Sequence, residues 1–152
     1  MDGLAKKLLL HPWFRLTRGL TLGVRAVLRD GEGRFLLIRH TYTPGWHLPG
    51  GGVERGETML DALHREVLEE TGAQVSEMPR LFGIYHNGTS FPGDHVGLFI
   101  VDAWSRDHTP GPNAEIAEQG FFAPDRLPDS VTAGTARRIG EIVDGLPPSA
   151  DW

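Results

Sequence analysis

Gly51-Gly52-Val53-Glu54-Arg55-Gly56-Glu57 stands seven residues ahead of Arg65-Glu66-Val67-Leu68-Glu69-Glu70-Thr71-Gly72 in this chain. The first segment is rich in glycine, which lets a backbone turn tightly and approach other groups closely. The second segment carries three glutamates at helical spacing. Together they predict a glycine turn directly before a helix that bears carboxylates on one side.

Local signals define both ends of this helix. Thr58 suits the N-cap position, and Asp61 three residues later completes a capping box. Gly72 suits the residue that follows the last turn of a helix. One apolar stripe recurs between them, at Leu60, Leu63 and Val67. The stripe predicts that this face of the helix packs on the core.

The three glutamates form another face of the predicted helix. Successive side chains turn by about 100°, so Glu66, Glu69 and Glu70 share an arc of roughly 100° at the edge of the apolar stripe. Like charges at this spacing destabilise a helix by about a few tenths of a kcal/mol per pair. A bound Mg²⁺ or Mn²⁺ would convert that repulsion into coordination, because hard cations prefer oxygen ligands. The spacing therefore predicts a divalent-cation site.

Two neighbouring features complete the predicted site. Arg65 can hold a glutamate in one rotamer through a bidentate pair, and Glu57 is its candidate partner. The run Pro49-Gly50-Gly51-Gly52 lets the backbone come close, so that a carbonyl oxygen there can serve as a neutral metal ligand.

The composition limits the class of protein. A length of 152 residues fits one domain with a single core. The chain has no cysteine, which excludes disulfide frameworks and zinc–thiolate sites and suits the cytoplasm. A net charge of -5 without a basic block argues against a dedicated DNA binder. No apolar run approaches the roughly 18 residues that suggest a membrane span.

Strands and turns alternate along the rest of the chain. Thr21 to Leu28 and Phe35 to Ile38 are predicted to form a hairpin around the turn at 29–33. Further short strands are predicted at 46–48, 81–85, 96–101 and from 121, with a second helix at 132–143.

This order predicts an α+β fold, an α/β/α sandwich in which a mixed β-sheet is flanked by helices. We expect an N-terminal amphipathic segment at 1–18, which packs on the domain or on a partner subunit. A single domain is expected at 19–146, followed by a loose tail at 147–152.

The opening segment as a whole resembles the Nudix box of the Nudix hydrolase superfamily. The box, G-x5-E-x7-R-E-U-x-E-E-x-G-U with U an aliphatic residue, matches Gly51–Ala73, and the one soft departure is Ala73, where a larger aliphatic residue is usual. The run GWHLPGG at 45–51 resembles the family's entry segment. The run FFAPDRLP at 121–128 resembles its W-F-x-x-x-x-L-P segment. The resemblance covers about residues 20–130 and implies the Nudix fold.

The resemblance implies hydrolysis of a phosphoanhydride (pyrophosphate) bond in a nucleoside diphosphate linked to a moiety X. It implies Mg²⁺ as cofactor, with Mn²⁺ as a substitute. The implied metal ligands are the Gly50 carbonyl and the carboxylates of Glu66, Glu69 and Glu70. The residues that would orient this set are Arg65, Glu57, Gly51 and Gly72.

The base that activates water varies within the superfamily and sometimes lies outside the box. Glu69 is the first choice here. Glu118, three residues before Phe121, is the second, because several members carry an additional carboxylate at that place. Glu115 competes with Glu118.

Residues outside the box select X. The substrate-binding candidates are Arg39, Tyr42, Trp46, Tyr85, Phe91, His86 and His95. Core packing is the favoured alternative for Trp46 and Tyr85, and loop histidines are more often polar surface. Gly88 and Phe91 stand where a proline and a tyrosine mark the ADP-ribose and dinucleoside-polyphosphate subfamilies, so neither marker is evident.

Two other function classes stay open. One is a non-catalytic Nudix-fold module that senses or binds a nucleotide, against which the intact box argues. The other is an RNA 5′-pyrophosphohydrolase, against which the weak basic character argues. The expected partner is a small nucleoside diphosphate derivative, without DNA and without a membrane span. A homodimer through the N-terminal segment is a further hypothesis.

Overall fold

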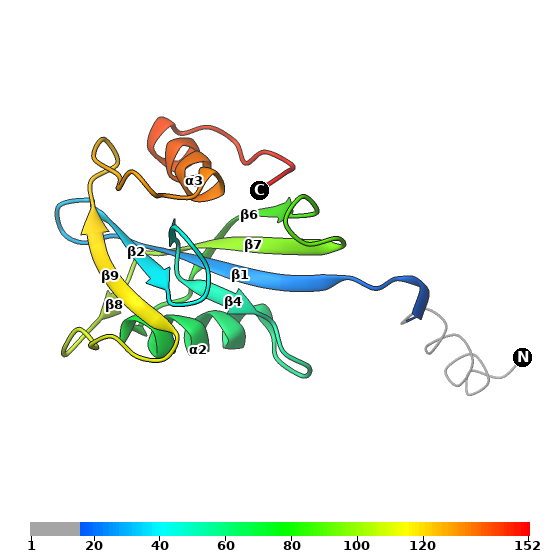
Figure 1. Cartoon of the computed structure of the whole chain (residues 1–152), viewed down its shortest axis with the longest axis horizontal. Helices are drawn as coiled ribbons and strands as arrows, with labels where there is room; N and C mark the ends of the chain where they lie inside the picture. Colours follow the sequence, from blue (N-terminus) through cyan, green and yellow to red (C-terminus); the bar gives the residue numbers. More distant parts are fainter. Residues whose placement is uncertain (1–15) are drawn as a thin grey trace, which may run out of the picture.

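Two β-sheets lie between two helices in the computed structural model of the chain, which describes residues 16–152 (Figure 1). The larger sheet contains, in spatial order, β4 (Gly50–Gly52), β1 (Thr21–Leu28), β7 (Asp94–Val101) and β6 (Arg80–His86). This sheet is mixed, because β1 runs parallel to β7 whereas β4 and β6 pair antiparallel with their neighbours. The parallel pair joins segments about seventy residues apart.

The smaller sheet is antiparallel and contains β3 (Trp46–His47), β2 (Phe35–His40) and β9 (Ile116–Phe122). A bulge between Arg39 and His40 shifts the register of β2 against β9. Two further short strands, β5 (Gln74–Val75) and β8 (Trp104–Ser105), pair with each other.

The predicted hairpin of 21–28 with 35–38 is wrong. A single bridge between Arg29 and Phe35 joins the two strands at the turn, and beyond it β1 and β2 enter different sheets. The second half of β1 and nearly all of β2 are buried on both faces. An inner position satisfies the backbone hydrogen bonds on both edges of such a strand, which a two-stranded hairpin would not do.

The first helix begins and ends where its caps predict, and the second lies one residue later than the predicted 132–143. In α2 (Met59–Thr71), the Thr58 hydroxyl accepts from the Asp61 N–H and the Asp61 carboxylate accepts from the Thr58 N–H, so the capping box is present. Gly72 follows with a φ of 74°. The second helix, α3 (Ala133–Asp144), begins after Thr132 and ends at Gly145.

The predicted sandwich is confirmed, with the sheet divided in two. Figure 1 shows α2 and α3 on opposite sides of the strands. Val67 and Leu63 of α2 pack in one apolar cluster with Val24 of β1. Ile139 of α3 packs in a second cluster with Val27. Because β1 contributes to both clusters, its alternate side chains hold the two helical layers to one sheet.

The C-terminal residues pack on the domain, in contrast to the loose tail that the sequence suggested. The His86 N–H donates to the Ala150 carbonyl at 2.8 Å, and the Trp152 N–H donates to the His86 carbonyl at 3.0 Å. Residues 148–152 therefore extend the edge at the end of β6, and they are called the C-terminal strap below.

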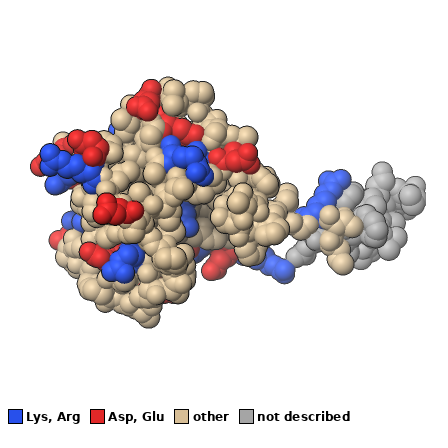
Figure 2. Space-filling view, turned by 45° about the horizontal axis from the view of Figure 1, so that its top comes forward, with Lys and Arg blue, Asp and Glu red and all other residues tan. Residues whose placement is uncertain are grey.

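The predicted N-terminal segment, 1–18, lies outside the described residues apart from 16–18. Within residues 16–152, no helix has the length and hydropathy that a membrane span requires. On the face drawn in Figure 2, basic and acidic side chains are interspersed.

We expect Gly50→Ala to lower the free energy of unfolding by at least about 2 kcal/mol, because it combines backbone strain with overpacking. Gly50 has a φ of 145°, and a Cβ there would lie 2.0 Å from the Val24 carbonyl oxygen of the paired strand. Urea denaturation measures the change. Gly31→Ala is the matched control, because a Cβ at Gly31 meets nothing within 4 Å. Equal denaturation midpoints for the two variants would contradict this account.

Candidate active site

Glu70 is a buried carboxylate that faces the glycine strand β4. Its side chain is 6% exposed, and its Oε2 accepts a hydrogen bond of 2.8 Å from the Gly50 N–H. Burial raises the pKa of Glu70 to about 8. The nearest basic group is His40, whose Nε2 lies 3.6 Å from Glu70 Oε1. Burial lowers the pKa of His40 to about 4, so this imidazole is neutral and offers no compensating charge.

Arg65 forms the predicted pair with Glu57. Its Nε donates to Glu57 Oε1 at 2.7 Å and its Nη2 donates to Glu57 Oε2 at 3.0 Å, a bidentate geometry. The guanidinium lowers the pKa of Glu57 to about 2. Its Nη2 also donates to the Gly52 carbonyl at 3.1 Å, and its Nη1 donates to Glu66 Oε1 at 2.6 Å. Arg65 therefore ties the loop before α2 to β4 and to one of the predicted metal ligands.

Glu66 packs directly against the backbone of β4. A Cβ on Gly51 would lie 2.4 Å from Glu66 Oε1, so only glycine allows this contact. The Glu66 side chain is 15% exposed, whereas that of Glu69 is 60% exposed. The Oε2 atom of Glu69 lies 3.5 Å from Arg65 Nη1. The three glutamates thus differ in their access to solvent although they share one helix face.

The donor chemistry fits a hard divalent cation. Within residues 16–152, no three acidic or histidine side chains are already gathered as metal ligands. Two carboxylates nevertheless converge on the Gly50–Gly51 backbone, and Glu70 is buried without a Lys or Arg ion pair among the described residues. A buried carboxylate of this kind is stabilised as an anion by a nearby cation.

Arg25 is a site residue that sequence reasoning missed. It lies on β1, and its Nη1 donates to the carbonyls of Leu48 and Gly50, both at 2.9 Å. Among residues 16–152 no carboxylate lies within ion-pair distance of it, although Glu70 and Glu66 interact with it at longer range. An arginine inside a predicted strand has no local signal for function, because its position depends on how β1 pairs with β4.

The structure separates the two carboxylates that compete as additional base. The Glu118 side chain does not contact the glutamate face of α2. Its carboxylate accepts from Arg39 Nη2 at 2.9 Å, and its neighbour Gln119 is the β9 residue that reaches the Glu70 carbonyl. Adjacent residues of a strand point to opposite faces, so Glu118 points away from Glu70. Glu115 precedes β9, and its charge helps to raise the pKa of Glu70.

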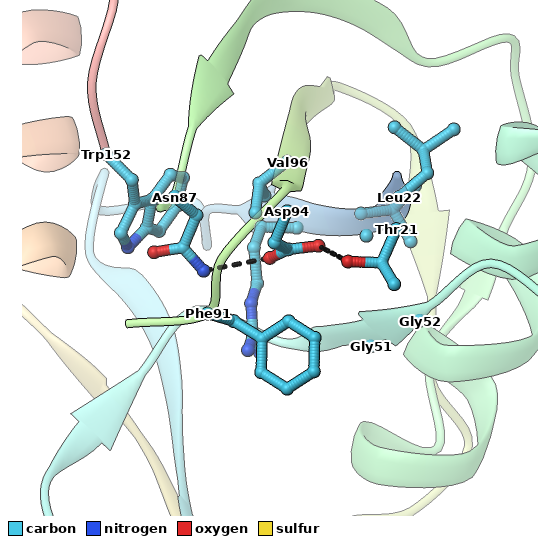
Figure 3. Close-up of a pocket in the computed structure, with 12 residues that line it drawn as sticks. Thr21, Leu22, Gly51, Gly52, Asn87, Phe91, Asp94, Val96 and Trp152 are labelled. Atoms are coloured by element: carbon cyan, nitrogen blue, oxygen red, sulfur yellow. Dashed lines mark hydrogen bonds between the residues drawn. The ribbon is translucent and has the colours of Figure 1, made fainter. Parts of the chain in front are cut away.

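Two adjoining cavities extend from β4, and none of the three glutamates lines either of them. The first, of about 410 Å³, is bordered by Gly51 and Gly52 at one end and by Phe91 (Figure 3). The second, of about 440 Å³, reaches the N-terminus of α3 at Thr132 and contains Arg137. Three residues border both cavities: Arg25, Asn87 and Trp152. The cavities therefore form one cleft that leads from the glycine strand to α3.

The predicted substrate residues are dispersed. Trp46 is 7% exposed and packs edge-on against Phe122 in the core below α3, so it does not border the cleft. Arg39 pairs with Glu118, and together with the exposed Tyr42 it borders a separate hollow of about 390 Å³.

Only one of the two predicted histidines borders the cleft. His86 borders the second cavity, and the ring of His95 packs against it with centroids 5.4 Å apart. The connection between β6 and β7 is shorter than predicted, because both strands extend to leave only residues 87–93 between them.

Comparisons with known proteins agree with this geometry. A family model described as "NUDIX domain" matches residues 19–141. A "MutT-like protein" of Streptomyces ambofaciens is 29% identical over 84% of this chain and 80% of its own length. An "ADP-ribose pyrophosphatase" of Methanocaldococcus jannaschii is 37% identical over 68% of this chain and 64% of its own length. The crystal structure of a MutT NUDIX hydrolase from Burkholderia pseudomallei superposes with a TM-score of 0.68 and 26% identity, and the match covers 80% of this chain and 97% of that one.

Proposed function

Because the chain belongs to the NUDIX domain family, we propose that it hydrolyses a phosphoanhydride bond in a nucleoside diphosphate linked to a moiety X. The family match, together with relatives named as a pyrophosphatase and a diphosphatase, makes the chain an enzyme of the Nudix pyrophosphohydrolase type. The observation that carries the proposal is the convergence of Glu66 and the buried Glu70 on the Gly50–Gly51 strand, whose Gly51 borders the cleft.

We assign the cation to the carboxylates of Glu66, Glu69 and Glu70 and to the Gly50 carbonyl. Mg²⁺, or Mn²⁺ in its place, would neutralise the diphosphate and lower the pKa of a bound water. Arg25 holds the Gly50 carbonyl through one of its two lone pairs and leaves the other free. Arg65 keeps the Glu66 carboxylate close to β4, the strand that carries the Gly50 carbonyl.

Arg25 is suited to bind the substrate's phosphate oxygens. Its Nη1 is fixed by two carbonyls, and Arg25 borders both cavities. Burial lowers the pKa of Arg25 without removing its charge, since arginine stays protonated in proteins. A guanidinium without an ion-pair partner in the described chain therefore supplies positive charge where this acidic protein needs it.

Glu69 is the proposed general base. Its carboxylate is the most exposed of the three, so it can accept the proton of an attacking water at Oε1 or Oε2 and return it to solvent. Glu115 replaces Glu118 as the alternative, because the charge of Glu115 acts on Glu70 whereas the Glu118 carboxylate pairs with Arg39.

A substrate panel with Mg²⁺ tests the proposal. It contains dNTPs, ADP-ribose, nucleotide sugars and dinucleotides, and the release of nucleoside monophosphate is measured. We expect release from at least one of these classes. A triphosphorylated RNA in the same panel tests the polymer alternative through loss of 5′ pyrophosphate. Tight nucleotide binding without any turnover would instead support a sensing module and defeat the hydrolase proposal.

A further inference from the structure

The C-terminal strap is fixed to the domain by a buried arginine. Arg138 of α3 has a side chain that is 1% exposed. Its Nη1 donates to the Asp151 carbonyl at 2.8 Å, and its Nη2 donates to Ser149 Oγ at 3.0 Å and to Glu141 Oε1 at 2.9 Å. Both terminal nitrogens of this buried guanidinium are hydrogen-bonded, and breaking the bonds of a buried charge is costly, so these contacts hold the strap in one place relative to α3.

The same arginine orders the aromatic rings around it. The Arg138 guanidinium lies 4.3 Å from the centre of the Tyr85 ring and 5.5 Å from that of the Trp152 ring. Tyr85 and Trp152 meet edge to face with centroids 5.5 Å apart. The phenol of Tyr85, itself fully buried, donates to Glu141 Oε2 at 2.9 Å. These contacts hold the Trp152 ring in one orientation, so a ligand that binds against it requires little reordering of the side chain.

The position of Trp152 makes it a wall of the cleft. Its side chain borders both cavities, and Figure 3 shows its indole at the pocket that Gly51 and Phe91 also border. A Cβ on Gly134 would lie 2.3 Å from Trp152 Nε1, so the first turn of α3 must have glycine there for the indole to fit. Among residues 16–152, nothing accepts a hydrogen bond from this indole N–H.

Hydrogen bonds also order the part of the first cavity that lies next to Trp152. Asn87 Nδ2 donates to Asp94 Oδ2 at 2.9 Å, and Thr21 Oγ1 donates to Asp94 Oδ1 at 2.7 Å. These bonds hold the 87–93 connection against β1. Phe91 belongs to this connection, is exposed and borders the first cavity. The cavity thus combines aromatic and apolar walls with the glycine strand at which the phosphates would lie.

We propose that Trp152 is a specificity-determining residue that packs against the planar ring of the substrate's nucleobase. It would make the cleft select nucleoside phosphoanhydrides over phosphoanhydrides that lack a base. The inference rests on the proposed function for the phosphate end of the substrate. Arg138 is the positioning residue in this arrangement, because it acts only by holding Trp152.

Steady-state kinetics of Trp152→Ala and Trp152→Phe test the proposal with the best nucleotide of the panel. We expect Trp152→Ala to raise KM about 10- to 100-fold, as for loss of base–aromatic stacking, and to leave kcat within about threefold because the carboxylate face is untouched. Trp152→Phe, which keeps a ring, should recover most of the loss. The Ki of inorganic tripolyphosphate as a competitive inhibitor should not change, because it has no base.

Leu146→Ala is the matched control, because Leu146 is exposed just before the strap and borders neither cavity. An unchanged KM in Trp152→Ala would overturn the inference. A KM and a Ki that rise together would also overturn it, because the residue would then act on the whole site. If Trp152→Ala hydrolyses the substrate with an unchanged KM, only this inference is rejected. If the wild-type protein hydrolyses no member of the panel, the proposed function is rejected.

A binding measurement removes the dependence on turnover and on the stability of the alanine variant. We expect AMP, GMP, CMP or UMP to quench the tryptophan emission of the wild-type protein, and Trp152→Phe to lose that quench. Ribose 5-phosphate, which lacks a base, should cause no quench in either protein. An equal quench in wild type and Trp152→Phe would place the base elsewhere and reject the proposal.

Discussion

Glu69→Gln is expected to lower kcat at least about a hundredfold while the protein stays folded. General-base catalysis contributes typically about 10²–10⁴-fold, and glutamine cannot accept the proton. The Glu69 side chain is 60% exposed and makes one weak contact, to Arg65, so its neutralisation removes little from the fold. The measurement is kcat on the best substrate, together with the melting temperature.

Glu77→Gln provides the matched control, because it makes the same chemical change at an exposed glutamate outside α2. Its kcat should equal that of the wild type. Near-normal turnover in Glu69→Gln would reject Glu69 as the base. The same experiment on Glu115→Gln and Glu118→Gln then distinguishes the alternatives, and we expect Glu118→Gln to be the milder of the two because Glu118 pairs with Arg39.

Removal of divalent cations with EDTA is expected to reduce turnover by on the order of a thousandfold or more, because cation stabilisation of transition-state charge contributes several kcal/mol. Addition of Mg²⁺ or Mn²⁺ in excess should restore it. The structural reason is that Glu66 and Glu70 meet at β4 while the described chain offers Glu70 no Lys or Arg ion pair. Turnover measured before chelation, after chelation and after readdition checks the result.

Glu70→Gln serves as the companion variant in this experiment. A neutral amide keeps the shape of the side chain but weakens the cation site, so the Mg²⁺ concentration required for half-maximal activity should rise. Turnover in EDTA equal to that in Mg²⁺ would rule out the proposed metal-dependent mechanism, whatever the behaviour of the variant.

Local sequence determined the helix and the residues on its faces. The capping box at Thr58 and the terminal Gly72 lie where the pattern predicted, since each depends on hydrogen bonds within a few residues. The pair of Arg65 with Glu57 spans only eight residues, and it too could be predicted. The apolar stripe placed the glutamates at the rim of the core because about 100° per residue is a property of any α-helix.

Strand pairing could not be read in the same way. The strands at 21–28 and 35–40 are both mostly apolar, with Arg25 in the first and Arg39 in the second, so periodicity does not show which partner each one takes. Their separation into two sheets brought Arg25 beneath Gly50, and the register of β2 against β9 turned Glu118 away from Glu70. These outcomes depend on contacts between segments far apart in the chain.

The sequence by itself thus determined the family, the helix α2 and the chemistry of its glutamate face, because these follow from short-range geometry and residue type. Only the tertiary structure decided the charge and shape of the cleft that extends from β4. Arg25 and Trp152 come from β1 and from the C-terminal strap, which no local pattern connects. Which distant segments pair depends on the burial of apolar surface and on the backbone hydrogen bonds of the whole fold. The residues that line the cleft therefore depend on the tertiary structure.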